Sequence, residues 1–214
     1  MNLEHFDLQY NSAQKTINDK IFQCSSKLSQ NPNDYQSLFE LILIAIHTEQ
    51  YNLALNFINE GNKLLPLSSE LFIAEIRVLL LKGEIEEAQK KISKFLNNYS
   101  KYKGYKNNRD TFLYLSNLSS SILLDYKLSN HLVLSSIKEF PEDYIAYEML
   151  AKNKIYLFGD IYEGRKLLKK LIKKYYKIST LKIYINSFLI DDPLKGCNEL
   201  KRFYNNFKTY NDEL

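Results

Sequence analysis

The chain has 214 residues and a net charge of +4, with 45% hydrophobic and 25% charged residues, which is the composition of an ordinary soluble globular protein. A chain of this length can bury a large core without disulfides or metals, and its longest dense apolar runs, such as Leu41 to Ile46, are far too short to span a bilayer. The N-terminal segment carries acids and lacks a basic stretch followed by an apolar run, so no secretory signal peptide is visible.

The cysteines and the uneven charge bear on localisation and on partners. Cys24 and Cys197 lie far apart without CxxC spacing, so we expect reduced structural cysteines in a cytoplasmic protein. Residues 1–100 hold 9 Lys and Arg against 12 Asp and Glu, a balance of −3, whereas residues 101–214 hold 20 against 13, a balance of +7. The positive second half indicates either an anionic partner or a solvated face.

Along the chain, apolar residues recur at helical spacing and no segment alternates as a strand would. The first expected element is a lone amphipathic helix from Ser12 to Gln30. After it, two kinds of helix alternate. One kind is apolar nearly all round and must be covered on several sides, as in 38–46, 71–81 and 112–124. The other kind has one wet face, as in 85–96 and 161–176. We therefore expect inner and outer helices in alternation.

The spacing of the prolines identifies a repeat. Pro32 and Pro66 are 34 residues apart, which is the length of a tetratricopeptide repeat. The string from Lys82 to Ala88, KGEIEEA, is very close to the turn between the two helices of that repeat, where the glycine accepts a tight turn and the alanine permits close helix approach. The first repeat matches the family's order of bulky and small residues at Leu38, Leu41, Ile42, Ala45, Tyr51, Ala54, Ile58 and Gly61. The chain thus resembles the tetratricopeptide-repeat (TPR) family.

The resemblance implies an all-α fold, a right-handed α-solenoid of about five helix–turn–helix units preceded by an N-terminal helix. We expect a single domain over residues 1–214. Its repeat units are expected at about 33–66, 67–100, 108–141, 142–177 and 178–211, with an inserted loop at 101–107. The third repeat is degenerate, because serines such as Ser116 and Ser129 take its small positions. In the fifth, Asp192 and Pro193 provide a strong helix start.

No pattern of catalytic or metal-binding residues accompanies the repeats. His5, His47 and His131 are isolated, with no Cys, Asp or Glu at metal-ligand spacing. The phosphate-binding, nucleophile-elbow and zinc-protease motifs GxxxxGK[ST], GxSxG and HExxH do not occur. We therefore expect a protein that is not an enzyme and that uses no cofactor and no metal.

The inner helices of TPR proteins line a concave groove, and residues off the core stripe point into it. Carried over to this sequence, the groove positions of the first three repeats are Phe39, Leu43, Ile46, His47, Ile73, Arg77, Leu80, Tyr114, Leu118 and Ile122. Those of the fourth and fifth repeats are Glu148, Lys152, Ile155, Lys182, Asn186 and Leu189. The resemblance implies a protein–protein interaction scaffold or adaptor that binds a helical or extended apolar segment of another protein. An alternative is that the chain fills its own groove with Leu3, Phe6, Leu8 and Tyr10.

A basic row marks the outer helix of the fourth repeat. Its members are Arg165, Lys166, Lys169, Lys170, Lys173, Lys174 and Lys177, and their spacing places them on the wet face. The alternative function is therefore binding of RNA or of an anionic membrane surface through the basic C-terminal half, with Tyr102, Tyr105, Tyr175 and Tyr176 as stacking side chains. A solvated face explains the same row. We favour a protein partner over nucleic acid or membrane, and self-association stays open.

Overall fold

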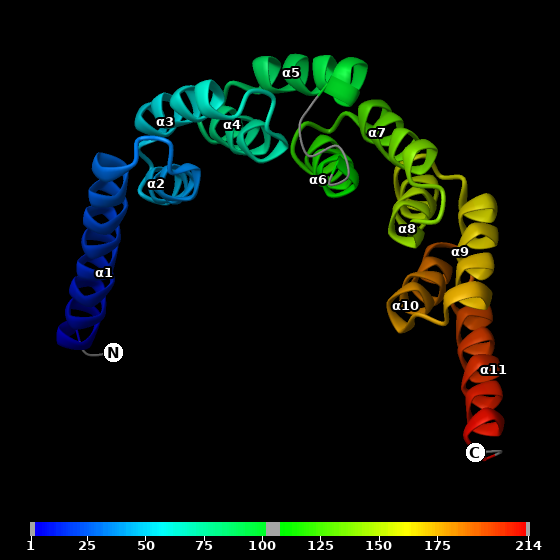
Figure 1. The fold of residues 1–214 in the computed structure, drawn as a ribbon. Helices are drawn as coiled ribbons and strands as arrows, with labels where there is room; N and C mark the ends of the chain where they lie inside the picture. The colour runs from blue at the N-terminus through cyan, green and yellow to red at the C-terminus, as the bar shows by residue number, and fades with distance from the viewer. Residues whose placement is uncertain (1–2, 102–107, 213–214) are drawn as a thin grey trace. The chain divides into compact units, whose positions relative to one another are not determined.

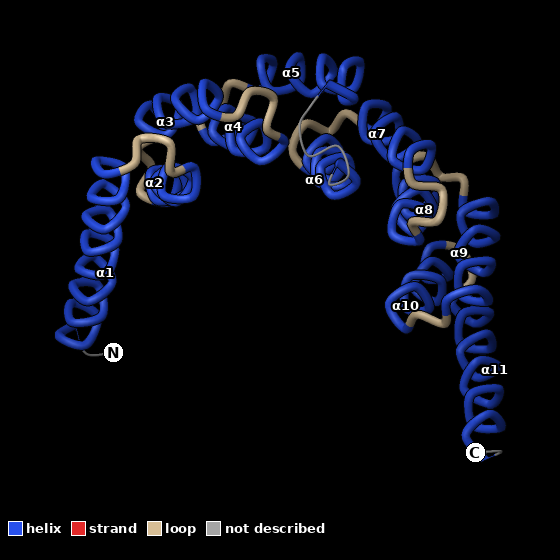
Figure 2. The backbone as a smooth tube through the Cα atoms, viewed as in Figure 1, coloured by secondary structure: helices blue, strands red, loops and turns tan. Residues whose placement is uncertain are grey.

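The computed structural model describes the backbone of residues 3–101 and 108–212 and the side chains of residues 15–101 and 109–205. Within these residues every regular element is a helix, and short loops join the helices (Figure 1, Figure 2). The chain is therefore all-α, as the apolar spacing predicts. Residues 102–107 of the expected inserted loop lie outside the described residues, as do the side chains of Leu3, Phe6, Leu8 and Tyr10. No helix in the described part of the chain combines the length and apolar character needed to cross a membrane.

The helices follow one another in pairs after a long first helix. Helix α1 spans Leu3–Gln30 and begins well before the predicted start at Ser12, because residues 3–11 contain no Gly or Pro that would end it. The pairs are α2 (Tyr35–His47) with α3 (Tyr51–Leu64), α4 (Ser69–Leu81) with α5 (Ile85–Asn98), α6 (Asn108–Ser121) with α7 (Tyr126–Glu139), α8 (Tyr144–Lys152) with α9 (Ile161–Tyr175), and α10 (Ile178–Ser187) with α11 (Pro193–Asp212). Short turns of 3-10 or π helix follow α5, α8 and α10 at Tyr99–Lys101, Asn153–Leu157 and Phe188–Ile190.

In the turn between the two helices of a pair, one residue adopts the left-handed backbone conformation that glycine favours. Gly83 and Gly159 have φ of 78° and 69°, and they precede α5 and α9. The first and third repeats lack this glycine, and Glu49 and Leu124 take the same region with φ of 59° and 53°. A side chain in this region costs roughly 1 kcal/mol or more, so these turns are held by the helices that flank them.

Residues 1–111 form one compact unit, whose core lies between α2, α3 and α4. Its central members are Ile42, Ala45, Ile46, Ala54, Ile58, Leu71, Ala74 and Val78. The small residues expected at close helix crossings are buried, since Ala54 and Ala88 are fully covered and a Cβ on Gly61 would touch the Leu71 side chain at 3.0 Å. The inner helices are therefore covered on several sides and α5 on one, as their sequences predict.

Residues 112–214 form a second compact unit. Its main core joins α8, α9 and α10 through Ala151, Ile155, Leu168, Ile172, Tyr184 and Phe188. Between α6 and α7 the core is partly polar: the hydroxyls of Ser116 and Ser129 lie 2.9 Å apart, and the Asn153 amide donates to Ser129 Oγ at 3.3 Å. Serines therefore stand beside buried apolar residues such as Phe112 and Leu132 in the degenerate third repeat. That the two units act as one domain stays a prediction.

Gly164 on α9 offers a direct test of the close crossing in the C-terminal unit. A Cβ at this position would lie 2.4 Å from Ile155 Cγ1 and 2.9 Å from the backbone oxygen of Ala151. At an open helix position Gly→Ala stabilises by about 1 kcal/mol, but here overpacking reverses the sign. Gly164→Ala should lower the free energy of unfolding in urea by about 1–3 kcal/mol. Lys170→Ala, at an exposed position of α9, is the matched control. Unchanged or increased stability of Gly164→Ala would contradict this packing.

Candidate binding surfaces

On α2 and α4, two rows of apolar side chains remain half-buried beside the core of the N-terminal unit. Phe39 and Leu43 are four residues apart on α2, and Ile73, Arg77 and Leu80 form a row on α4. Phe39 packs on the core and stacks on Tyr35, with ring centroids 6.1 Å apart. We call these five residues the α2–α4 rows. They have apolar surface that the described residues leave partly uncovered.

Ile46, which was expected in the groove, belongs to the core instead. Its side chain is 5% exposed and packs in the cluster between α2, α3 and α4. The reason is local: α2 ends at His47, and a three-residue turn folds α3 back over the end of α2. Ile46 is therefore not available to a partner. His47, the next residue, is exposed.

Some groove positions of the C-terminal unit are exposed or half-buried, and others are buried in the core. Tyr114 and Leu118 are half-buried on α6, but Ile122 lies beyond the end of α6 and is 49% exposed. Ile155 is 3% exposed, because it packs in the core of α8, α9 and α10. The groove prediction for Ile155 is therefore wrong, whereas that for Ile122 stays a prediction. The charged positions are partly engaged within the protein, since Glu148 accepts from Thr180 Oγ1 at 2.6 Å and pairs with Lys152 at 3.3 Å. Lys182, Asn186 and Leu189 are exposed.

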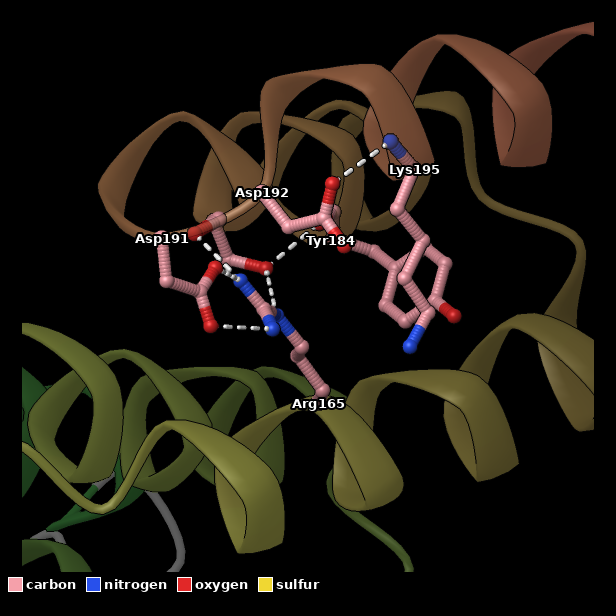
Figure 3. Close-up of polar contacts among 6 residues, drawn as sticks. Arg165, Tyr184, Asp191, Asp192 and Lys195 are labelled. Atoms are coloured by element: carbon pink, nitrogen blue, oxygen red, sulfur yellow. Dashed lines mark hydrogen bonds and ion pairs between the residues drawn. The ribbon is translucent and has the colours of Figure 1, made fainter.

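Arg165 does not lie on the wet face of α9, where the basic row placed it. Its side chain is 15% exposed and reaches to the end of α10. Its Nε donates to Ser187 Oγ at 2.9 Å and a terminal nitrogen donates to Ser187 O at 2.7 Å, while the guanidinium pairs with the Asp191 carboxylate (Figure 3). The same guanidinium lies 3.8 Å from the centre of the Phe188 ring. Arg165 therefore ties α9 to α10, a contact that helical spacing alone does not show.

The remaining cations of the row differ in what they contact. Lys166 pairs with Glu163 at 3.1 Å, and Lys174 pairs with Glu142 at 2.8 Å, contacts that raise the pKa of both lysines. Lys177 Nζ lies 5.7 Å from the centre of the Tyr144 ring. Lys169, Lys170 and Lys173 make no ion pair with a described residue. Part of the row is thus structural, and part carries uncompensated charge.

The tyrosines next to the row are divided as well. Tyr175 packs on Tyr144, with ring centroids 5.5 Å apart, and its hydroxyl donates to the backbone oxygen of Glu142 at 3.4 Å. Tyr176 is 76% exposed and ends α9 in a left-handed conformation with φ of 48°. Of the four proposed stacking residues, Tyr175 is therefore already used within the protein, and Tyr102 and Tyr105 lie outside the described residues.

A cleft that the sequence did not reveal lies between α9, the end of α10 and the start of α11. Its volume is about 710 Å³. It is lined by Lys195 from α11 and by four lysines of α9, Lys166, Lys169, Lys170 and Lys173. Tyr184 lines it and is 4% exposed, and burial together with Glu199 raises the pKa of Tyr184 to about 12. Asp192 and Pro193 mark the start of α11 in the sequence, but only the packing of α11 brings Lys195 to α9.

The Arg165–Asp191 pair predicts a pH-dependent contribution to stability. Hydrogen bonding from Arg165 holds the pKa of the Asp191 carboxyl below its ordinary value of 3.8. A depressed pKa in the folded state stabilises the protein above the ordinary value, and the contribution is lost as the pH falls through the folded pKa. Asp191→Asn should therefore lower the melting temperature at neutral pH, and the difference from wild type should shrink below pH 3.8. Glu86→Gln, at an exposed carboxylate on α5, is the control. A difference that persists in acid would exclude the ion pair as its cause.

No protein-family model and no curated protein sequence matches the chain. Solved structures do match. A tetratricopeptide repeat protein from Parabacteroides merdae has a TM-score of 0.62 and 11% identity, covering 94% of this chain and 78% of its own. PilW, described as a widely conserved type IV pilus biogenesis factor, has a TM-score of 0.60 and 16% identity, covering 96% and 90%. YrrB, a TPR protein with an unusual peptide-binding site, has a TM-score of 0.53 and 14% identity, covering 82% and 87%.

These neighbours share the arrangement of consecutive helix pairs seen in Figure 1, and the match to each extends over more than four-fifths of this chain. In the sequence, the segments around Gly83 and between Pro32 and Pro66 indicate the same repeat. The chain therefore has the tetratricopeptide-repeat fold.

Proposed function

We propose that the protein is a non-catalytic scaffold or adaptor that binds a helical or extended apolar segment of another protein against the α2–α4 rows. The observation that supports this proposal is the half-buried apolar surface of Phe39, Leu43, Ile73 and Leu80. Helical-repeat proteins use the faces of their inner helices as extended binding surfaces. Arg77, in the same row as Ile73 and Leu80, supplies a polar group that can fix the register of a bound segment.

The free energy gained by burying these apolar side chains is sufficient for a moderate affinity. Full burial of a Leu, Ile or Phe side chain contributes roughly 1.5–3 kcal/mol, and completing the burial of a half-covered side chain contributes a part of that. Four such side chains, together with the contacts of their neighbours, can anchor a partner segment after the cost of ordering it has been met.

Two further observations agree with the proposal. YrrB, which has the same fold, is described as having a peptide-binding site. We also propose a cytoplasmic location; Cys24 and Cys197 are both free thiols, the first buried and the second exposed, which suits a reducing compartment. Binding of RNA or of an anionic membrane is the alternative, and it is weakened because Arg165, Lys166 and Lys174 already have partners within the protein.

The experiment begins by selecting random peptides on the wild-type protein. One enriched peptide is then labelled, and its affinity is measured by fluorescence anisotropy. Enriched peptides should share apolar or aromatic residues at spacings of three or four, or at alternate positions. Leu43→Glu with Ile73→Glu should weaken binding at least about tenfold, because each change places a charge against the apolar segment. Added salt should change the wild-type affinity little.

Matched variants separate the α2–α4 rows from other surfaces. Leu53→Glu with Ile85→Glu makes the same two kinds of change at positions on α3 and α5 that are 39% and 46% exposed, and it should retain the affinity. Helical circular dichroism checks that each variant folds. If the Leu43 and Ile73 variant unfolds, these residues belong to the core and the proposal fails. It also fails if that variant folds and still binds, or if steep loss of binding with salt shows that phosphate-like contacts carry it.

A further inference from the structure

The cleft between α9, α10 and α11 contains more positive charge than its own carboxylates compensate. Each acid in its wall is already engaged. Asp160 accepts from Lys154 at 2.8 Å, Asp191 is paired with Arg165, and Glu199 accepts from the Tyr184 hydroxyl at 3.3 Å. By contrast, Lys169, Lys170 and Lys173 have no ion pair with a described residue, and Lys195 Nζ lies 5.9 Å from the centre of the Phe188 ring. The cleft therefore fits an anionic ligand.

The arrangement of these charges suits an extended chain. Lys166, then Lys169 and Lys170, then Lys173 follow one another at intervals of three or four residues on α9, so they form a row about 10 Å long at 1.5 Å per residue. Side chains on one side of an extended peptide lie about 7 Å apart, since each residue advances about 3.3 Å. An extended segment along α9 can thus place two carboxylates against the row. Lys195 adds a cation from α11 (Figure 3).

The chemistry of the cleft favours a peptide over a phosphate backbone. Asp160, Asp191 and Glu199 lie among the lysines and provide hydrogen-bond acceptors, to which the phosphates of a nucleic acid have no N–H group to donate. A peptide instead supplies backbone N–H groups, which those carboxylates can accept. Two of the three aromatic residues in the wall, Tyr184 and Phe188, are only 4% and 2% exposed and cannot stack on a base. Tyr162 is exposed, and Lys166 Nζ lies 5.9 Å from the centre of its ring.

We propose that this cleft is a second binding site, which takes an extended acidic peptide segment of a partner protein through Lys169, Lys170, Lys173 and Lys195. The site is made by residues 159–199 of the C-terminal unit and is separate from the α2–α4 rows of the N-terminal unit. The proposal therefore does not depend on the function assigned to those rows.

The test uses a labelled peptide with Glu at every second residue and the full chain, with affinity measured by fluorescence anisotropy at low salt. The wild type should bind the peptide and lose it as salt increases. Lys169→Glu with Lys173→Glu should weaken binding at least about tenfold, because two attractive charges become repulsive. Lys127→Glu with Lys138→Glu, which makes the same charge change on α7, is the control and should bind within about twofold of wild type.

Two more variants make the result decisive. Lys170→Gln with Lys195→Gln removes one cation from each of two helices without introducing repulsion, and it should also weaken binding. Leu43→Glu with Ile73→Glu should leave the affinity for the acidic peptide unchanged, which separates this site from the α2–α4 rows. Equal weakening by the α7 control would show non-specific charge attraction and overturn the proposal. Displacement of the peptide by an equal concentration of oligouridylate would also overturn it, because the cleft would then bind RNA as well as it binds the peptide. The same holds if vesicles of anionic phospholipid displace the peptide and the Lys169 and Lys173 variant no longer binds these vesicles.

Discussion

Close approach of consecutive helices is the constraint on which the arrangement of this protein depends. A helix pair can bring its backbones together only where one helix presents little or no side chain, and Ala54, Ala88 and Gly164 fill that role on α3, α5 and α9. Gly164 is the most demanding case, because the space that a Cβ would need is taken by Ile155 and by the backbone of Ala151. Each crossing fixes which side of an inner helix is covered by its outer partner. The remaining side is then left to the neighbouring inner helices or to a ligand.

The two compact units satisfy this constraint with different chemistry. In the N-terminal unit the inner helices bury aliphatic residues, and the core closes by the hydrophobic effect. In the C-terminal unit, hydroxyl and amide groups of Ser116, Ser129 and Asn153 fill part of the interior, where they satisfy one another's hydrogen bonds. Arg165 adds a further polar tie between α9 and α10. Directional contacts of this kind depend on every partner being present, so this unit is expected to be the more sensitive to single polar substitutions.

The same difference extends to the surfaces. The α2–α4 rows are apolar apart from Arg77, whereas the cleft beside α9 is lined by lysines. An apolar surface and a basic cleft respond oppositely to salt, and they select different segments. An adaptor with both can hold an apolar segment and an acidic segment at once, and linked segments gain affinity from one another when their linker spans the distance between sites. The two proposals thus describe one kind of protein, although each is tested alone.

The sequence by itself determined the helical class, the pairing of helices and much of the turn chemistry. These follow from local rules: the period of apolar residues, the left-handed preference of Gly83 and Gly159, and the helix start at Asp192 and Pro193. The resemblance of the first two repeats then indicated the fold, which the solved structures support. The apolar character of the α2–α4 rows could also be read from the sequence, because Phe39 and Leu43 leave the core stripe at a spacing of four.

Only the tertiary structure decided which of those side chains are covered. Helical period assigns Ile46 to the same row as Phe39, but the return of α3 buries it. It assigns Arg165 to the wet face with Lys169, but the long Arg165 side chain donates hydrogen bonds to Ser187 and Asp191, which lie 22 and 26 residues further along the chain. The cleft with Lys195 exists for the same reason, since it needs α11 to pack near α9. Period places a residue on a face of its own helix, whereas burial and pairing depend on which other helices cover that face.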